Sequence, residues 1–388
     1  MHRLRLTDAD RLLLALTVLV KVGVLAIGAV AYWWLTGRLD AQGALEVWNR
    51  WDAPHYLDLV VFGYRAVDAG DLVGPNGYRS VYPGDLPLYI VFYPLFPWAA
   101  TAVNAVLDNP LLSAFTVSTL ASLFVAPLMH RLVRHDHEPG VALRAAWFVL
   151  IFPTAYFLHI GYTESLFMAL VLGAMLAGRG RRWWLAGLLG GLAALTRING
   201  LVLLLALGVE AATQWSEQPA GERRLRPEWA AIGLVAVGFA AYLALNLVVY
   251  GDAFEFLRVQ RTHWFKEAAP PWDAISGAFG WLSSDDPDTV LMHGGMELLF
   301  TAIGLAGVIA SAFLLRPALF AWMTGNWLLF TSTSFLLSIP RYTLTLFPLM
   351  ILMALLTRRT WALVALSALS LAGFVYFAAR FALGDWAF

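Results

Sequence analysis

The 388-residue sequence contains no cysteine. This absence excludes disulfide bonds, thiolate nucleophiles and cysteine-based metal sites. Charged residues are also scarce, because Asp, Glu, Lys and Arg make up 13% of the chain whereas hydrophobic residues make up 60%. A typical soluble domain has about twice that share of charged residues. The composition therefore indicates that lipid, rather than water, surrounds most of the chain.

Neither charge sign is in excess, since 26 basic residues balance 26 acidic residues. The chain therefore has no overall field that would attract nucleic acid, and we expect no nucleic-acid partner. Apolar segments recur from residue 12 to residue 383 with no long hydrophilic block between them. We therefore expect one membrane domain over 1–388. Its first apolar run is too long for a signal-peptide core and lacks a small-residue cleavage site, which predicts a retained span.

Apolar runs long enough to cross a bilayer predict an all-α polytopic membrane protein with about eleven transmembrane helices. The predicted helices cover 12–36, 111–131, 145–158, 165–178, 184–196, 199–213, 229–250, 296–315, 317–337, 341–357 and 361–380. Basic segments predict the cytoplasmic side. They are the leader with Arg3, Arg5 and Arg11, then Arg131 to Arg144, Arg179 to Arg182, Arg223 to Arg226, Arg316, and Arg358 with Arg359. This topology requires that 184–213 cross twice and that 90–107 not cross.

The same topology places the segments richest in polar groups on the outer side. They are the first outer loop 37–110, the breaks at 159–164 and 196–200, the second outer loop 251–295 and the turn 338–342. Within the first outer loop, Pro54 to Phe62 and Tyr89 to Val106 have the apolar and aromatic pattern of helices that lie in the membrane interface. One face of the protein should therefore collect the chemically useful side chains.

Asp52 lies in the first outer loop within the sequence Asn49 to Tyr56. Since Pro54 follows it closely, Asp52 could simply cap the start of a helix. Alternatively, Asp52, His55 and Tyr56 share one helix face, because they stand at positions i, i+3 and i+4. A carboxylate beside a histidine at an apolar boundary is a candidate general base.

Three further segments place lone charges between apolar helices. His159 and Glu164 lie between two predicted spans, where such charges usually belong to a site or a pathway. Alternatively, Thr163 could cap the second span, and the helix dipole could favour Glu164 in its first turn. Arg197 lies in the break Thr196 to Gly200. Arg341 follows Pro340 at a predicted helix start, where unpaired backbone N–H groups favour an anion. Two arginines on the outer side of such an apolar frame indicate an anionic ligand, although Arg341 could instead pair with an outer-loop acid such as Asp252.

Five segments occur in order along the chain: RWDAPHY at 50–56, YPLFPW at 93–98, FPTAYFLHIGYTESLF at 152–167, LTRINGL at 195–201 and SIPRYTLTLFPL at 338–349. Together they resemble the PIG-V family, the second mannosyltransferase of GPI-anchor synthesis and its prokaryotic relatives, within the GT-C class of membrane glycosyltransferases. The stretch 250–257 with Gln260 and Trp264 also looks like prokaryotic members. The resemblance implies a GT-C type bundle, a dolichyl- or polyprenyl-phosphate sugar as donor with mannose as the sugar, and a catalytic aspartate that matches Asp52.

We therefore expect transfer with inversion to a glycan or lipid acceptor, with Asp52 as the base. A lipid phosphate leaves as a stable anion, so one carboxylate suffices where a glycosidase needs two. Arg341 and Arg197 would hold the departing phosphate. The candidate substrate-binding residues are Trp51, His55, Tyr56, His159, Glu164, Arg197, Asn199, Arg341 and Tyr342. No cofactor is required, although Asp52 with Glu164 could form an oxygen site for a divalent cation such as magnesium or manganese.

Two other classes of protein fit the same charges. A transporter or lipid flippase would line its substrate path with them, and Lys21 inside the first span could belong to such a path, unless it only extends to the membrane surface. A non-catalytic partner in a membrane complex is the third reading. Frequent alanine and arginine favour a prokaryotic plasma membrane as the location. Membrane lipids would then surround the bundle, and the predicted topology would place the site on the extracytoplasmic side.

Overall fold

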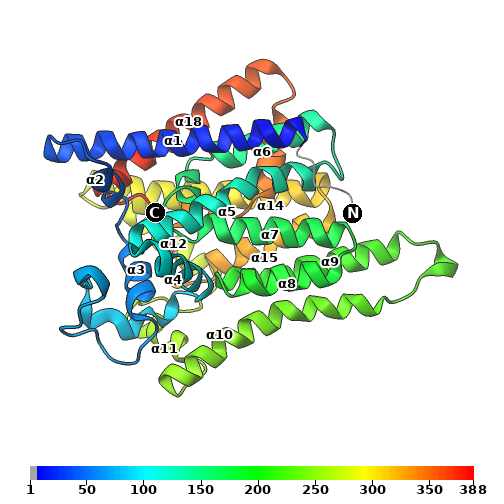
Figure 1. The fold of residues 1–388 in the computed structure, drawn as a ribbon. Helices are drawn as coiled ribbons and strands as arrows, with labels where there is room; N and C mark the ends of the chain where they lie inside the picture. The colour runs from blue at the N-terminus through cyan, green and yellow to red at the C-terminus, as the bar shows by residue number, and fades with distance from the viewer. Residues whose placement is uncertain (1–6) are drawn as a thin grey trace.

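The computed structural model describes residues 7–388 as a bundle of helices (Figure 1). Among these residues, six helical segments are long and apolar enough to cross a membrane. They are Asp8–Thr36 (α1), Pro110–Val133 (α5), Ile198–Ser216 (with α9, Val202–Ser216), Pro227–Tyr250 (with α10, Leu234–Tyr250), Pro287–Leu314 (with α14, Glu297–Leu314) and Thr360–Leu383 (α18). The predicted all-α polytopic membrane fold is confirmed. The basic residues Arg3 and Arg5 lie outside the described residues.

Shorter helices complete the bundle and its two outer loops. Those in the bundle are α6 (Pro139–Ile151), α7 (Glu164–Arg179), α8 (Trp183–Ala194), α15 (Pro317–Thr331), α16 (Ile339–Thr343) and α17 (Pro348–Leu356). The first outer loop carries α2 (Ala41–Glu46), α3 (Ala53–Phe62), a 3₁₀ segment (Pro83–Val91) and α4 (Leu95–Leu107). The second carries α11 (Glu255–Thr262) and α12 (Pro271–Trp281). Figure 1 shows α2, α3, α4 and α11 gathered at one end of the bundle, opposite the first described residues.

Three predicted helices have wrong bounds. The helix predicted at 145–158 ends at Ile151, because Pro153 disfavours helical geometry in the residue before it. The helix predicted at 317–337 ends at Thr331, because the residues after it pair with the second outer loop. The Ala269 N–H donates to the Ser332 carbonyl, and the Ser334 N–H donates to the Glu267 carbonyl. The helix predicted at 341–357 is two helices, α16 and α17, because Pro348 begins a new helix and cannot donate a backbone hydrogen bond within the old one. The predicted break inside 184–213 is confirmed, as residues 195–197 separate α8 from the next helical segment.

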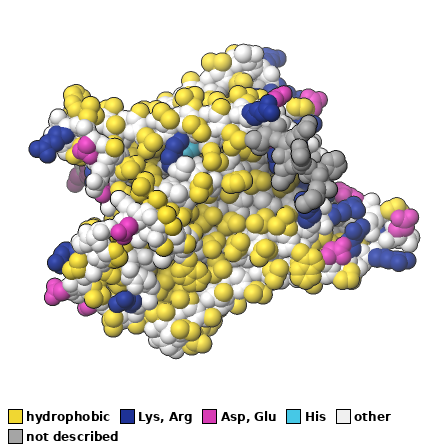
Figure 2. All heavy atoms as spheres, in the orientation of Figure 1, with side chains coloured by type: hydrophobic (Ala, Val, Ile, Leu, Met, Phe, Trp, Pro, Cys, Tyr) yellow, Lys and Arg dark blue, Asp and Glu magenta, His cyan; other side chains and the backbone are white. Residues whose placement is uncertain are grey.

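Ion pairs tie the predicted cytoplasmic segments together at one end of the bundle. Arg131 at the end of α5 reaches Asp10 of α1 at 2.8 Å. Glu210 of α9 pairs with Arg316 at 2.7 Å and with Arg179 at 3.3 Å. Hydrophobic side chains cover the flank of the bundle between its two ends, and most charged side chains lie at those ends (Figure 2). These ion pairs thus bring three of the basic segments, those of Arg131, Arg179 and Arg316, into contact with neighbouring helices.

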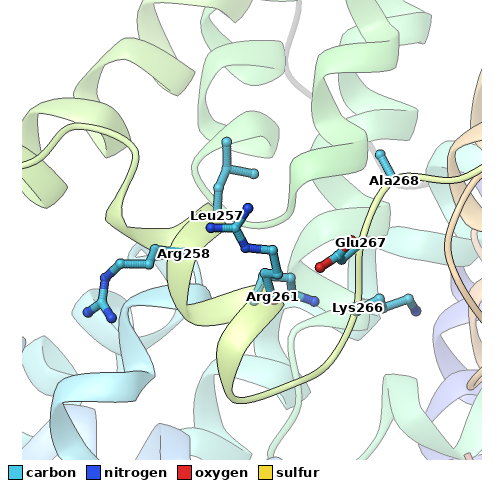
Figure 3. Close-up of a pocket in the computed structure, with 7 residues that line it drawn as sticks. Leu257, Arg258, Arg261, Lys266, Glu267 and Ala268 are labelled. Atoms are coloured by element: carbon cyan, nitrogen blue, oxygen red, sulfur yellow. The ribbon is translucent and has the colours of Figure 1, made fainter.

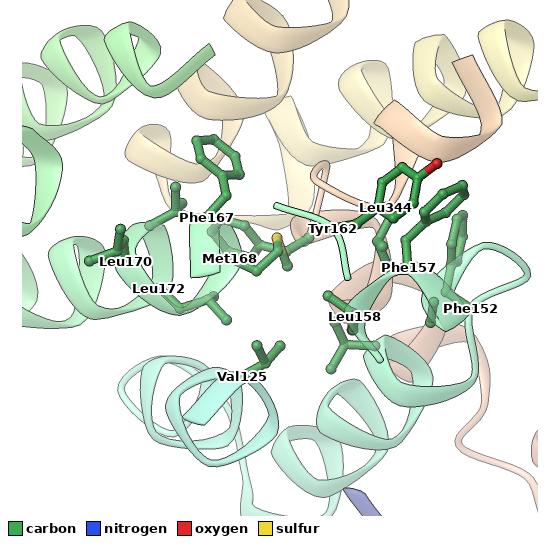
Figure 4. Packing of buried hydrophobic residues seen from close by; sticks show 14 of the residues in the cluster. Val125, Phe152, Phe157, Leu158, Tyr162, Phe167, Met168, Leu170, Leu172 and Leu344 are labelled. Carbon is green, nitrogen blue, oxygen red and sulfur yellow. The ribbon is translucent and has the colours of Figure 1, made fainter. Parts of the chain in front are cut away.

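The helices pack closely where small residues face each other. A Cβ atom on Gly238 of α10 would lie 2.1 Å from the carbonyl oxygen of Gly191 of α8, so this crossing requires glycine. Buried aromatic and aliphatic side chains fill the centre, among them Phe157, Tyr162 and Phe167 (Figure 4). The irregular segment 152–163 runs through this centre and carries the chain into α7.

Candidate active site

Four charged side chains from separate parts of the chain form one network. The Nε of Arg341 donates to Oε1 of Glu164 at 2.6 Å, and its Nη1 donates to Oδ2 of Asp52 at 2.6 Å. The Nη1 of Arg197 donates to the same Glu164 oxygen at 2.6 Å. The structure thus brings together the candidate base and the charged residues of three other segments that the sequence singled out.

Exposure increases across this network from Glu164 to Asp52. The Glu164 side chain is 0% exposed, those of Arg341 and Arg197 are 6% and 15% exposed, and that of Asp52 is 31% exposed. Within residues 7–388, Oδ1 of Asp52 accepts no hydrogen bond, since Arg341 uses only Oδ2. Asp52 is therefore the member of the network that an incoming hydroxyl group can reach.

Asp52 precedes α3, but its side chain does not cap that helix. The Asp52 carboxylate makes no capping hydrogen bond, so the capping interpretation is wrong, and the ion pair with Arg341 takes its place. Trp51, immediately before it, has a φ of 55°, a left-handed conformation that is costly for a bulky residue and that turns the chain into α3. Burial alone would raise the pKa of the Asp52 carboxyl, but the charge and hydrogen bond of Arg341 outweigh burial and hold that pKa below its ordinary value.

The segment before α7 supplies the inner part of the network. Thr163 does not cap α7, because its Oγ1 instead accepts a hydrogen bond from Arg197 Nη1 at 2.9 Å. The rings of Phe157 and Tyr162 lie on Arg341, each with its centroid 4.7 Å from the guanidinium carbon. Both side chains are labelled in Figure 4. Sequence reasoning quoted these two aromatic residues without assigning them a role, and cation–π contact is the role that the structure gives them.

Glu297 holds the turn that carries Arg341. Its carboxylate is fully buried and accepts the backbone N–H groups of Ser338 at 2.7 Å and Ile339 at 2.8 Å. Two of the N–H groups expected to favour an anion at this helix start therefore already bind the Glu297 carboxylate. Sequence reasoning missed Glu297, whose only signal is a lone acid at the start of the apolar run of α14. A π-helical turn, Val290–Met296, immediately precedes it, and such turns are frequent at functional sites.

We predict that Glu297→Gln weakens activity through Arg341. The amide offers one acceptor oxygen where the carboxylate offers two, so one buried N–H loses its partner, at a cost of about 1–3 kcal/mol in stability. In a double-mutant cycle, Glu297→Gln should add little to the activity loss of Arg341→Ala. Glu210→Gln is the control, because it alters a buried carboxylate in the ion-pair cluster at the opposite end of the bundle. Its activity loss should add in full to that of Arg341→Ala. Additive losses for Glu297→Gln as well would contradict this positioning role.

The other candidates of the first loop lie in an aromatic cluster beside Asp52. The His55 ring lies 4.5 Å from Tyr89, 5.2 Å from Phe92 and 6.0 Å from Trp264, measured between ring centroids. Burial lowers the pKa of His55, which keeps the imidazole neutral at pH 7, and its Nδ1 has no hydrogen-bond partner among residues 7–388. Tyr56 packs edge-on against Phe92, Phe96 and Tyr162. Trp51 is partly exposed and contacts Trp386 edge-on at 5.0 Å.

The remaining candidates differ in their distance from the network. Tyr342 contacts it, since the Arg197 guanidinium carbon lies 5.5 Å from the Tyr342 ring. Asn199 instead donates to Asn326 of α15 at 3.0 Å, an interhelical hydrogen bond in the bundle. His159 is fully buried, and its backbone carbonyl links it to α1 by accepting a hydrogen bond from Lys21 Nζ at 2.6 Å. The structure gives Asn199 and His159 contacts that hold the bundle together.

A divalent cation does not fit between Asp52 and Glu164. The guanidinium of Arg341 contacts both carboxylates and would repel a metal ion at that position. Within residues 7–388, no three or more His, Asp or Glu side chains are grouped closely enough to share a metal ion. The described residues therefore favour recognition of a ligand by arginine.

A family model and two relatives show which family this chain belongs to. Glycosyltransferase family 87 matches residues 89–340, which is more than half of the chain. GPI alpha-1,6-mannosyltransferase 2 of Mus musculus is 34% identical over 164 residues, covering 42% of this chain and 31% of the mouse protein. The Rattus norvegicus protein of that name is 30% identical over 182 residues, covering 43% and 32% of the two chains. The matched part is thus about a third of these relatives' length.

The fold also resembles a solved membrane enzyme structure. ArnT from Cupriavidus metallidurans, solved bound to undecaprenyl phosphate, superposes with a TM-score of 0.53 at 16% identity, covering 92% of this chain and 63% of ArnT. At this identity the likeness shows the fold alone, and it confirms the predicted GT-C type of bundle. The sequence identity to these mannosyltransferase relatives confirms the PIG-V resemblance. Because the family match spans most of the helical bundle, this chain belongs to glycosyltransferase family 87.

Proposed function

We propose that this glycosyltransferase moves a sugar, specifically mannose, from a polyprenyl- or dolichyl-phosphate donor to a glycan or lipid acceptor. The observation that carries the proposal is the network in which Arg341 joins the exposed Asp52 to the buried Glu164. It combines an accessible base with arginines suited to phosphate. The names of the mannosyltransferase relatives and the undecaprenyl phosphate in the ArnT structure support the same sugar and the same class of donor.

In the proposed reaction, Asp52 accepts the proton of the acceptor hydroxyl through Oδ1. The hydroxyl oxygen then bonds to the anomeric carbon from the side opposite the phosphate. The bond between that carbon and the phosphate oxygen breaks, and the lipid phosphate leaves with the electron pair. Attack from the opposite side inverts the anomeric centre, and the low basicity of the phosphate removes the need for a protein acid.

The arginines retain hydrogen-bond donors for that phosphate. A guanidinium has five N–H groups. Arg341 uses Nε and Nη1 for Glu164 and Asp52, which leaves Nη2 for a ligand. Arg197 uses Nη1 for Thr163 and Glu164, which leaves Nε and Nη2. Glu164 thus orients both arginines, and the phosphate would bind to the donors that remain.

The whole of 1–388 would act as one transmembrane glycosyltransferase domain. In this arrangement the first outer loop, 37–110, supplies the base, and the second, 251–295, covers the sugar donor. The ion-paired basic end would face the cytoplasm, since cytoplasmic segments are enriched in arginine and lysine. Asp52 would then work on the extracytoplasmic side, and we propose the prokaryotic plasma membrane as its location.

A transporter or flippase is the competing function. Its candidate intramembrane charge, Lys21, is fixed by hydrogen bonds to Thr119 and to the His159 carbonyl, both at 2.6 Å, which favours a structural role over a substrate path. Mass analysis of lipid-linked glycans in cells with and without the gene separates the two functions. Deleting a transferase should remove the complete glycan and leave a form that lacks one hexose. A transporter deletion leaves every glycan intact and changes only its membrane distribution.

The lowered pKa of Asp52 predicts a flat acid side of the pH profile. Asp52 must be ionised to accept a proton, so activity falls only when the pH drops through its lowered pKa. We expect kcat/KM to stay level from pH 7 down to about 5, because even an unperturbed aspartate titrates near 4. Initial rates measured over this range at low substrate concentration test the expectation. A midpoint near 6 would show that a group other than Asp52 accepts the proton.

A further inference from the structure

Lys266, in the second outer loop, lies beside the network without belonging to it. Its Nζ is 5.6 Å from the ring centroid of Phe335 and 5.7 Å from that of Tyr342. The guanidinium carbon of Arg197 lies 5.5 Å from the same Tyr342 ring. Tyr342 is therefore in contact with Lys266 and with an arginine of the network.

The backbone around Lys266 is held in place by the chain that leads to Arg341. The N–H of Glu267 donates to Ser334 Oγ at 3.1 Å, and the N–H of Ser334 donates back to the Glu267 carbonyl at 2.9 Å. The N–H of Ala269 donates to the Ser332 carbonyl at 3.3 Å. Lys266 is thus positioned by segment 332–334, which precedes the Arg341 turn.

The Lys266 side chain extends away from its charged neighbours. A cavity of about 360 Å³ separates α11 from residues 266–268, and Arg261 and Glu267 line it. Figure 3 shows the Lys266 side chain extending away from those of Arg261 and Glu267. Within residues 7–388, Lys266 makes no ion pair and no side-chain hydrogen bond, so its ammonium N–H groups are available to a ligand. Its charge acts on the buried carboxylate of Glu297 without a direct contact.

Charge balance indicates what that ligand is. Asp52 and Glu164 neutralise Arg197 and Arg341, so the network has no net charge to offer a phosphate. A phosphate brought to this apolar frame needs a further cation, because an unpaired charge is costly there. Lys266 supplies one, and an ammonium group binds phosphate as a point charge.

We propose that Lys266 binds the phosphate of the lipid-linked sugar donor, together with the free N–H groups of Arg197 and Arg341. This inference rests on the proposed function and adds a residue to its substrate site. Exposed apolar side chains of the same loop, Phe254, Leu257 and Phe265, lie close to Lys266 in the sequence and would contact the prenyl chain at the membrane interface. The second outer loop then recognises both parts of the lipid phosphate.

Selective chemistry tests the proposal on the unaltered protein, because the chain has two lysines, Lys21 and Lys266. The full-length protein in lipid nanodiscs is treated with an amine-acylating reagent, and the modified peptides are quantified by mass spectrometry. At ten times its dissociation constant, undecaprenyl phosphate should slow the modification of Lys266 about 10-fold. Lys21, hydrogen-bonded inside the bundle, is the internal reference and should not change.

Two lipids separate phosphate recognition from other causes of protection. Undecaprenol has the prenyl chain without phosphate, and phosphatidylglycerol has a phosphate without the prenyl chain. Neither should protect Lys266. Equal protection by undecaprenol would overturn the phosphate contact, and equal protection by phosphatidylglycerol would overturn the assignment to the sugar donor.

A pair of variants gives a second, independent readout. Lys266→Gln should weaken binding of undecaprenyl phosphate by about 10- to 100-fold, as expected for loss of a charged hydrogen bond. Arg261→Gln removes a neighbouring cation that points elsewhere and should change it less than about 2-fold. Equal losses in both variants, or none in either, overturn the inference. Binding that depends on Lys266 without any transfer of sugar would instead overturn the proposed function and leave this site standing.

Discussion

Replacing Asp52 with asparagine is expected to slow sugar transfer by about 10²- to 10⁴-fold, the usual contribution of a general base. The amide cannot accept a proton from the acceptor hydroxyl, although it keeps the shape of the side chain. Because Asp52 does not cap α3, the loss cannot be attributed to an unravelled helix start. The effect should appear in kcat, with the dissociation constant of the sugar donor nearly unchanged.

Asp40→Asn is the matched control for this change. Asp40 is also an aspartate of the first outer loop, and its carboxylate does cap a helix, accepting the Gly43 N–H at 2.6 Å. Asparagine caps helices about as well as aspartate, so transfer should stay close to normal. Comparing initial rates of the two variants separates base catalysis from local folding. Turnover of Asp52→Asn within a few-fold of wild type would remove Asp52 from the catalytic role.

Arg341→Ala is expected to damage both stability and activity. The change leaves Glu164, which is fully buried, with Arg197 as its one ionic partner in the described part of the chain. Removing one member of a buried ion pair typically costs about 3–5 kcal/mol. The variant also loses a phosphate contact, so the folded fraction should bind the sugar donor about 10- to 100-fold more weakly. Melting temperature and donor affinity should therefore fall together.

Arg341→Lys should rescue Arg341→Ala poorly. An ammonium cannot reach Glu164 and Asp52 in the two directions of the guanidinium fork, and it does not stack on Phe157 and Tyr162 in the same way. The variant keeps the positive charge, so a purely electrostatic role predicts near-complete rescue. A sharp fall in melting temperature with unchanged donor affinity in the folded fraction would show that Arg341 is structural, and phosphate binding would then be assigned to Arg197 and Lys266.

The charged residues of the site could be predicted from sequence because each is conspicuous in its surroundings. Glu164, Arg197 and Arg341 are lone charges at breaks between apolar helices, and such residues seldom remain without a partner or a function. Their pairing could not be predicted, since Asp52 and Arg341 are 289 positions apart and no local pattern joins them. Local patterns were in fact misleading here, because Asp52 and Thr163 have the sequence of helix caps but bind arginines instead.

Other contributors lacked a distinguishing sequence signal. Phe157 and Tyr162 are two aromatic residues among many, and only the path of segment 152–163 places them on Arg341. Glu297 lies in an apolar run that has the sequence of an ordinary transmembrane helix. The π-helical turn before it shifts the direction in which the following side chains point, and a regular period of 3.6 residues does not predict that shift. The helix predicted at 317–337 ends early because tertiary backbone pairing at Ser332 and Ser334 replaces its last turns.

The most direct test follows the sugar itself in a purified system. The protein and its Asp52→Asn variant are each incubated with polyprenyl-phosphate mannose, radiolabelled in the sugar, together with a lipid extract that supplies the acceptor. The wild-type protein should move the label to a new glycan or glycolipid and release an equal amount of polyprenyl phosphate, while Asp52→Asn leaves the label on the donor. Label that stays on the donor with the wild-type protein, or moves equally fast with Asp52→Asn, would contradict the assignment of Asp52 as the base of a lipid-phosphate-dependent transferase.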